Sequence, residues 1–233
     1  MKSLVKTAGS FDKVLASCKS IGERYQPPTP ALGITALSDL SNRLQQTKQA
    51  VIVTRATYRL AVNSRQQSFA GIATLSVRVV NMLAASGVSD QDLADAISLK
   101  NQLQRTSRKR TSLPPVSTAN GNVPARRAAS RKHFEMRTET FASLVRIVES
   151  IETYAPNECD LKLNALTNKL DELARKSFEV EMASIAFGKA RKERQQLVFG
   201  EQGVEDTLQA VKRYIRAAFG VVSLEASQIA DAD

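Results

Sequence analysis

The 233-residue sequence lacks tryptophan, contains one histidine and two cysteines, and has only 10 glycines. With His133 alone, the chain has no second imidazole for a histidine-based metal site. Cys18 and Cys159 have neither the spacing of a zinc site nor that of a disulfide framework, so we expect buried or inert thiols. No glycine-rich phosphate loop is present. These absences predict a non-enzymatic protein without metal or cofactor.

Two further absences concern location. The N-terminus lacks the continuous apolar run of a signal peptide, because Lys13 and Lys19 follow soon after Lys2 and Lys6. No window approaches the roughly 18 uncharged apolar residues that a membrane-spanning helix needs. We therefore expect a cytoplasmic protein that does not contact a membrane.

The residues that are abundant favour helix. Alanine, leucine, glutamine, lysine, arginine and glutamate are plentiful, and all of them are good helix formers. Hydrophobic residues make up 42% of the chain, which is enough to bury a core. Composition therefore predicts an all-α protein.

The net charge of +10 is unevenly distributed along the chain. Residues 1–100 carry +6, residues 133–233 carry −4, and residues 101–132 carry +8 without a single acid. The basic residues of this middle segment are Arg105, Arg108, Lys109, Arg110, Arg126, Arg127, Arg131 and Lys132. Most of the excess charge is thus concentrated between the two ends of the chain.

An internal repeat relates the two ends. Residues 25–71 and 154–200 align without a gap at a spacing of 129, and 12 of the 47 positions are identical. The identical positions include Tyr25 and Tyr154, Pro27 and Pro156, Leu37 and Leu166, Leu44 and Leu173, Arg65 and Arg194, and Gly71 and Gly200. At the same spacing Leu15 matches Leu144 and Cys18 matches Ile147. A helical unit has therefore been duplicated.

Apolar periodicity and turn residues place the elements. They predict helices over 3–24, 31–67, 72–86, 89–104, 133–153, 158–199 and 204–219, and a loosely held or partly helical tail over 221–233. In both long helices the apolar residues alternate at steps of three and four, which is typical of helices packed in bundles. Gly188 interrupts the second long helix and suggests a close helix–helix approach. Tyr25 and Tyr154 are expected to lock the first helix of each copy against the second through packing and a hydroxyl bond.

The repeat divides the chain into a first unit over 1–104, a basic linker over 105–130 and a second unit over 131–233. Pro114, Pro115 and Pro124 argue against regular structure in the linker, which we expect to be flexible.

The linker allows two interpretations. Its six basic residues, with Arg131 and Lys132 directly after it, could contact phosphates and bind DNA or RNA without sequence specificity. No aromatic residues interleave with them for base stacking, and no recognition-helix motif is present. The alternative is a solvated linker or a tether for the acidic second copy. The two copies, one basic and one acidic, could also attract each other within a chain or join head to tail between chains, which closes a ring or grows a filament.

Several motifs resemble a family. The Tyr-x-Pro turns at Tyr25 and Tyr154, and the run from Asn63 to Phe69 that ends the first long helix, look like those of duplicated, all-helical bacterial proteins that carry no assigned activity. The resemblance covers about residues 10–225 and implies the fold alone.

These observations combine into one interpretation. We expect two tandem repeats of helical hairpins with long helices, packed as an antiparallel bundle. The expected function is that of a structural or interaction protein that self-associates or binds another protein. The alternative is a nucleic-acid-associated protein that uses the basic linker.

Overall fold

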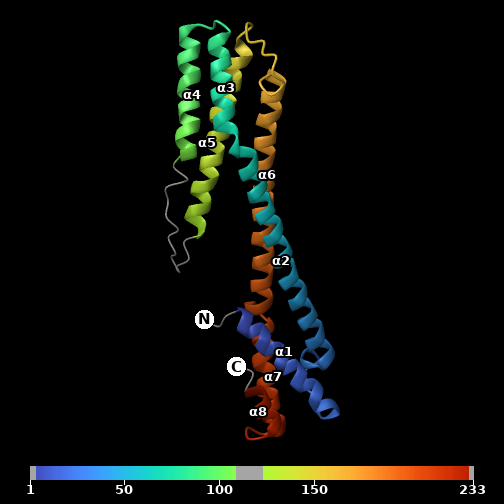
Figure 1. Ribbon diagram of the computed structural model, residues 1–233. Coiled ribbons are helices and arrows are strands. Elements are labelled where there is room, and N and C mark those ends of the chain that lie inside the picture. Colours follow the sequence, from blue (N-terminus) through green and yellow to red (C-terminus); the bar gives the residue numbers. More distant parts are fainter. Residues whose placement is uncertain (1–3, 109–122, 231–233) are drawn as a thin grey trace. The chain divides into compact units, whose positions relative to one another are not determined.

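The structure, a computed structural model, describes residues 4–108 and 123–230, and every regular element in these ranges is a helix (Figure 1). The all-α class is therefore confirmed for this part of the chain. The α-helices are α1 (Leu4–Ile21), α2 (Ile34–Ala70), α3 (Ile72–Ala85), α4 (Asp90–Arg108), α5 (Val123–Ser150), α6 (Leu163–Phe199), α7 (Val204–Phe219) and α8 (Leu224–Ala230). Two short 3-10 helices, Gly22–Arg24 and Pro30–Leu32, lie between α1 and α2.

The chain forms two compact units. Unit 1 contains residues 1–58 and 183–233, and unit 2 contains residues 59–182. Each of the long helices α2 and α6 therefore contributes to both units. The predicted ranges 1–104 and 131–233 likewise contribute to both units, and their interpretation as repeats stays a prediction.

The core of unit 1 brings the two ends of the chain together. Helix α1 packs against α7 and α8, and the beginning of α2 and the end of α6 complete the cluster. Its most buried members are Phe11, Val14, Cys18, Leu37, Leu44, Val198, Val204, Leu208, Val211 and Ile215. Helix α8 belongs to this core because Ala226 and Ile229 are buried. Of the two alternatives for the tail, loosely held or partly helical, the second is confirmed for residues 224–230.

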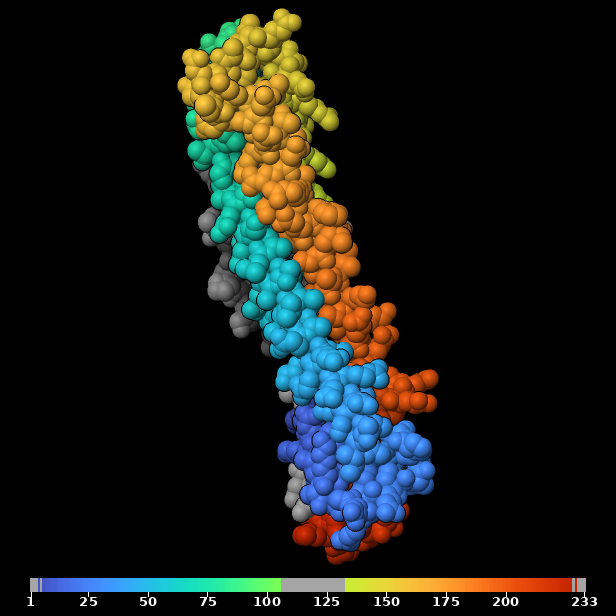
Figure 2. All heavy atoms as spheres, turned by 90° about the vertical axis from the view of Figure 1, so that its right-hand side faces the viewer, coloured from blue at the N-terminus to red at the C-terminus, as the bar shows by residue number. Residues whose placement is uncertain are grey.

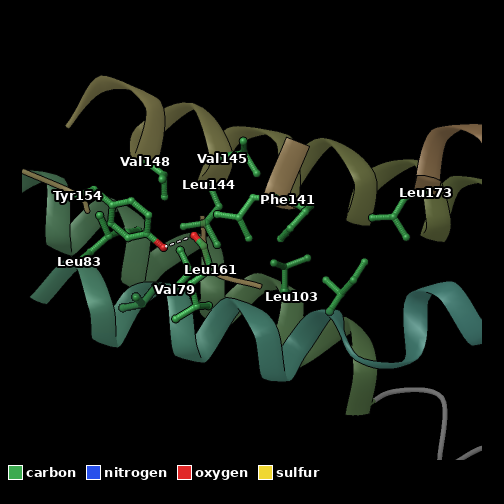
Figure 3. Packing of buried hydrophobic residues seen from close by; sticks show 14 of the residues in the cluster. Val79, Leu83, Leu103, Phe141, Leu144, Val145, Val148, Tyr154, Leu161 and Leu173 are labelled. Atoms are coloured by element: carbon green, nitrogen blue, oxygen red, sulfur yellow. Dashed lines mark hydrogen bonds between the residues drawn. The ribbon is translucent and has the colours of Figure 1, made fainter. Parts of the chain in front are cut away.

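The core of unit 2 lies among α3, α4 and α5, which pack side by side (Figure 1). Figure 3 shows Val79 and Leu83 of α3 and Leu103 of α4 facing Phe141 and Leu144 of α5. The adjoining parts of α2 and α6 contribute further buried residues, namely Phe69, Leu166 and Leu173.

Two tyrosines anchor the turns before the long helices. The hydroxyl of Tyr25 donates a hydrogen bond to the Leu32 carbonyl at 2.8 Å, and that of Tyr154 donates to the Leu161 carbonyl at 2.9 Å (Figure 3). Burial raises the pKa of both tyrosines, to about 12 for Tyr154. Each tyrosine thus makes a hydroxyl bond, as predicted, but the bond stays within the turn and the predicted lock between the first and second helices stays a prediction. Each acceptor lies seven residues ahead, so each bond closes the turn on itself.

Buried positions recur at regular spacings. Helix α3 buries positions 72, 76, 79, 80 and 83, and α7 buries positions 204, 208, 211, 212 and 215, which correspond one to one at a spacing of 132. The long helices share both bounds at a spacing of 129.

The first helices correspond differently from the alignment. The buried residues of α1 at positions 7, 11, 14, 15 and 18 match those of α5 at 137, 141, 144, 145 and 148, a spacing of 130. Matching Leu15 with Leu144 at 129 was therefore wrong by one residue. The reason is that one fewer residue separates Ile151 from Tyr154 than separates Ile21 from Tyr25.

Two local predictions were wrong. Irregular structure was expected over 105–130, but α4 continues to Arg108 and α5 already begins at Val123; residues 109–122 lie outside the described residues. Pro124 does not oppose this helix because it sits in the first turn, where a missing N–H breaks no hydrogen bond. At Gly188 an added Cβ would meet no atom within 4 Å, so this glycine marks no close helix contact.

One described stretch, Ile34–Ala85, is long and apolar enough for a membrane span by length and composition alone, and part of its apolar segment is buried inside the protein. Because α3 supplies Ile72, Val79 and Leu83 to the core of unit 2, the apolar character of this stretch has a structural explanation.

Candidate interaction surface

The middle of α6 exposes a line of large apolar side chains. Phe178, Met182 and Ile185 are 61%, 50% and 60% exposed. Their i, i+4, i+7 spacing places them on one face of the helix. At about 100° per residue, this face lies opposite Val180 and Phe187, which point to the packed side. We name these three residues the α6 row.

The middle of α2 exposes a second apolar line. Ile52 and Val53 are each 52% exposed and Leu60 is 70% exposed. The opposite side of α2 carries Tyr58, which stacks on Phe187 with ring centroids 6.2 Å apart. We name Ile52, Val53 and Leu60 the α2 row. Figure 2 shows atoms of α2 (blue to cyan) and of α6 (orange) at the surface.

Both rows are unusual for helices of a soluble core. An amphipathic helix covers one apolar face and turns a polar face to water. Here the middle of each long helix is apolar on two opposite sides, and only one side is packed. Contiguous exposed apolar side chains rimmed by charge are typical of interaction sites.

The residues that flank the two rows differ in charge. Residues 44–63 of α2 carry three bases, Lys48, Arg55 and Arg59, and no acid. In α6 the acids Glu179 and Glu181 lie among the row residues, and the bases Arg175, Lys176 and Lys189 lie just before and after them.

Glu179 is held in its charged form within α6. Its carboxylate accepts hydrogen bonds from Lys176 Nζ at 2.8 Å and from Arg175 Nη1 at 3.2 Å. The bond from Lys176 lowers the pKa of Glu179 below its ordinary value. The carboxylate beside the α6 row is therefore ionised at neutral pH.

Polar pairs join α2 to α6, and α3 to the turn before α6, inside unit 2. Ser68 donates to Glu172 at 2.7 Å and Lys169 donates to the other oxygen of the same carboxylate at 2.8 Å. Arg78 pairs with both oxygens of Asp160. Beside these pairs lies a hollow of about 490 Å³, whose charged lining groups are Arg78, Asp160 and Lys169. All three are already engaged in ion pairs.

A larger hollow of about 600 Å³ lies in unit 1 where α6 joins α7. Its lining combines one cation, Arg43, with two carboxylates, Glu193 and Glu201. Gln202 adopts a positive φ of 55° and donates its N–H to the Asp206 carboxylate at 3.1 Å. Across the described ranges no three His, Cys, Asp or Glu side chains gather to hold a metal.

The predicted basic residues are partly placed. Arg105 is exposed on α4, and Arg108 is the last residue of that helix. Lys109 and Arg110 lie outside the described residues. Four lie within the first ten residues of α5, namely Arg126, Arg127, Arg131 and Lys132. Cys18 is buried, where burial raises its pKa, and Cys159 is exposed.

The apolar rows were missed when the sequence was interpreted. The signal was present, because Phe178, Met182 and Ile185 fall outside the three-four alternation that marks the packed side of α6. Comparison with protein-family profiles, with curated proteins and with solved structures finds no match to this chain.

Proposed function

We propose that this protein is a non-enzymatic structural or interaction protein that self-associates through the middles of its long helices. We further propose that it is a tandem duplication whose two repeats form an antiparallel bundle. The recurrence of buried positions in α3 and α7 supports the duplication. Within unit 1, Tyr58 of α2 stacks on Phe187 of α6. One hollow is lined by Arg43, which precedes Tyr58 in α2, and by Gln196, which follows Phe187 in α6. Residues earlier in α2 therefore lie near residues later in α6, which supports antiparallel long helices.

The observation that carries the proposal is the pair of exposed apolar rows, one beside Arg55 and Arg59 and the other beside Glu179 and Glu181. The proposed occupant of each row is a second copy of this chain. The α2 row of one copy packs on the α6 row of the next, where Arg55 and Arg59 meet Glu179 and Glu181. If the α2 row of the second copy returns to the α6 row of the first, the contact closes a dimer; otherwise it is heterologous and closes a ring or grows a filament. Apolar contact provides affinity and the charges select the pairing.

Charge reversal tests this pairing. The variant R55E/R59E and the variant E179K/E181K should each remain monomeric, because each brings like charges together. Mixed in equal amounts they should associate again, because the reversed α2 row of one fits the reversed α6 row of the other. Sedimentation velocity on each variant and on the mixture measures this. A mixture that sediments as the separate monomers would contradict the proposed pairing.

Replacing exposed apolar side chains by serine provides a second, independent test of the proposed self-association. F178S/I185S should lose association, whereas V222S/L224S should keep it. The control residues are equally apolar and are 98% and 74% exposed, but they precede or begin α8 and belong to neither row. Equal association of both variants would contradict a role for the α6 row.

The second candidate is non-specific binding of DNA or RNA. It is favoured by the four bases that α5 concentrates between positions 126 and 132, in a stretch of the chain without acids. Replacing Arg108, Lys109, Arg110, Arg126 and Arg127 by serine should weaken binding to duplex DNA and to RNA, and the salt dependence should become shallower. Absence of binding by the unmodified protein at low salt would eliminate this candidate.

A further inference from the structure

Each of the two cores combines helices from the early and the late part of the chain. In unit 1, α1 packs on α7 and α8, and in unit 2, α5 packs on α3 and α4. We call residues 4–108 the first half and residues 123–230 the second half. The first helix of each half thus packs on the last two helices of the other half.

Corresponding helices also begin alike. The Ser89 hydroxyl accepts the Asp92 N–H at 3.1 Å at the start of α4, and the Ser223 hydroxyl accepts the Ala226 N–H at 3.1 Å at the start of α8. In both cases a serine caps the helix that packs on the other half's first helix. Together with the matched burial of α3 and α7, this indicates that the two halves offer each other equivalent surfaces.

One contact joins a residue to its own counterpart. Tyr58 and Phe187 occupy equivalent positions of α2 and α6, and their rings stack with planes 14° apart. When two copies of one segment associate isologously, a residue near the symmetry element meets its own equivalent. The contact is therefore the kind that a self-complementary pair of segments makes.

Neither half contains a complete core. Phe11, Leu37 and Leu44 of the first half are covered by Val204, Leu208 and Ile215 of the second. Val79, Leu83 and Leu103 of the first half lie against Phe141 and Leu144 of the second (Figure 3). Separating the halves would expose both cores to water.

We infer that the two halves are complementary partners held together without need of the covalent connection, and that a second copy of this chain can supply either half. Two chains that exchange halves rebuild the same two units, which is domain swapping. Within one chain the connection keeps the partner half at high effective concentration, so exchange is expected when chains fold together at high concentration. The inference rests on the cores and is independent of the α2 and α6 rows.

Cutting the full-length protein tests the first part. A protease recognition sequence is inserted between Ser117 and Thr118, in the segment that joins α4 to α5, and the folded protein is cleaved. Native mass spectrometry should find both fragments in one particle with the mass of the cleaved chain. Fragments that separate without denaturant would overturn the inference.

Isotope labelling tests exchange. Cleaved protein grown in heavy isotopes is mixed with unlabelled cleaved protein, unfolded in denaturant and refolded by dilution. Particles with one heavy and one light fragment should make up about half of the total, the statistical share for interchangeable halves. Recovery of the fragments as separate species would overturn the inference. Using F178S/I185S for both samples removes surface association from the result, so failure of the row proposal does not affect this measurement.

Discussion

The ring of Tyr58 lies parallel to that of Phe187, with centroids 6.2 Å apart, and this contact joins α2 to α6 within unit 1. Stacked aromatic pairs contribute about 0.5–1.5 kcal/mol beyond burial. A double-mutant cycle of Tyr58→Ala and Phe187→Ala, measured by urea unfolding, should give a coupling of that size.

Phe178 supplies the matched control for this cycle. It lies on the same helix as Phe187 but is 61% exposed on the opposite face, so Tyr58→Ala and Phe178→Ala should be additive. Equal coupling in both cycles would contradict the assigned contact.

Removing the Tyr154 hydroxyl should destabilise the protein. Tyr154→Phe leaves the Leu161 carbonyl without its 2.9 Å donor, which costs about 1 kcal/mol of unfolding free energy. The variant should also change how the free energy of unfolding depends on pH in the alkaline range. Burial raises the pKa of Tyr154 from 10.0 to about 12, so its contribution is fully present below pH 10 and is lost as the pH rises toward 12. Urea unfolding across this range should therefore show a smaller alkaline loss for Tyr154→Phe than for the unmodified protein, and equal losses would contradict the assignment.

Glu172 should make the free energy of unfolding decrease as the pH falls into the acidic range. Hydrogen bonds from Lys169 and Ser68 lower its pKa below the ordinary value of 4.5. Its contribution is therefore present above 4.5 and is lost as the pH falls through the lower folded-state value. Glu172→Gln should lower the thermal unfolding midpoint at about pH 7, and the difference from the unmodified protein should shrink as the pH is lowered below 4.5. Glu152→Gln, at an exposed turn residue, serves as the control that should leave the midpoint unchanged. A difference that stays constant as the pH is lowered would contradict the proposed ion pair.

Substitution by alanine should change the stability of the protein in opposite directions at two glycines, Gly188 and Gly203. At Gly188, inside α6, an added Cβ meets open space, so Gly188→Ala should stabilise by about 0.5–1 kcal/mol because alanine loses less backbone entropy in a helix. At Gly203 an added Cβ would lie 2.7 Å from the Gly200 carbonyl oxygen and 2.9 Å from that of Leu197. Gly203→Ala should destabilise by about 1–3 kcal/mol. Thermal unfolding of the two variants measures the difference, and a shift of the same sign in both would contradict these environments.

The sequence predicted the helices well because their signals are local. Tyr-x-Pro turns, the Gly87 stop and the apolar alternation of α2 and α6 are each contained within a few residues. Gly87 and Gly220 adopt positive φ, as helix-ending glycines do. Pro124 misled the prediction because proline excludes the interior of a helix but suits its first turn.

The arrangement of the cores was beyond local signals. The apolar periodicity of α1 does not indicate whether α1 packs on α7 or on α3, because these two helices bury equivalent positions. The α6 row was visible as apolar residues outside the packed face, but its exposure depends on which helices cover α6. The basic residues drew attention first because charge is counted directly from the sequence.

Self-association is the central claim, and the mass of the unmodified protein in solution tests it most directly. Sedimentation equilibrium over a wide range of protein concentrations should give a weight-average mass that rises above the 25.4 kDa of one chain. The rise should be smaller at high salt, because the charges beside the two rows are then screened. A mass of 25.4 kDa at every concentration would contradict the claim.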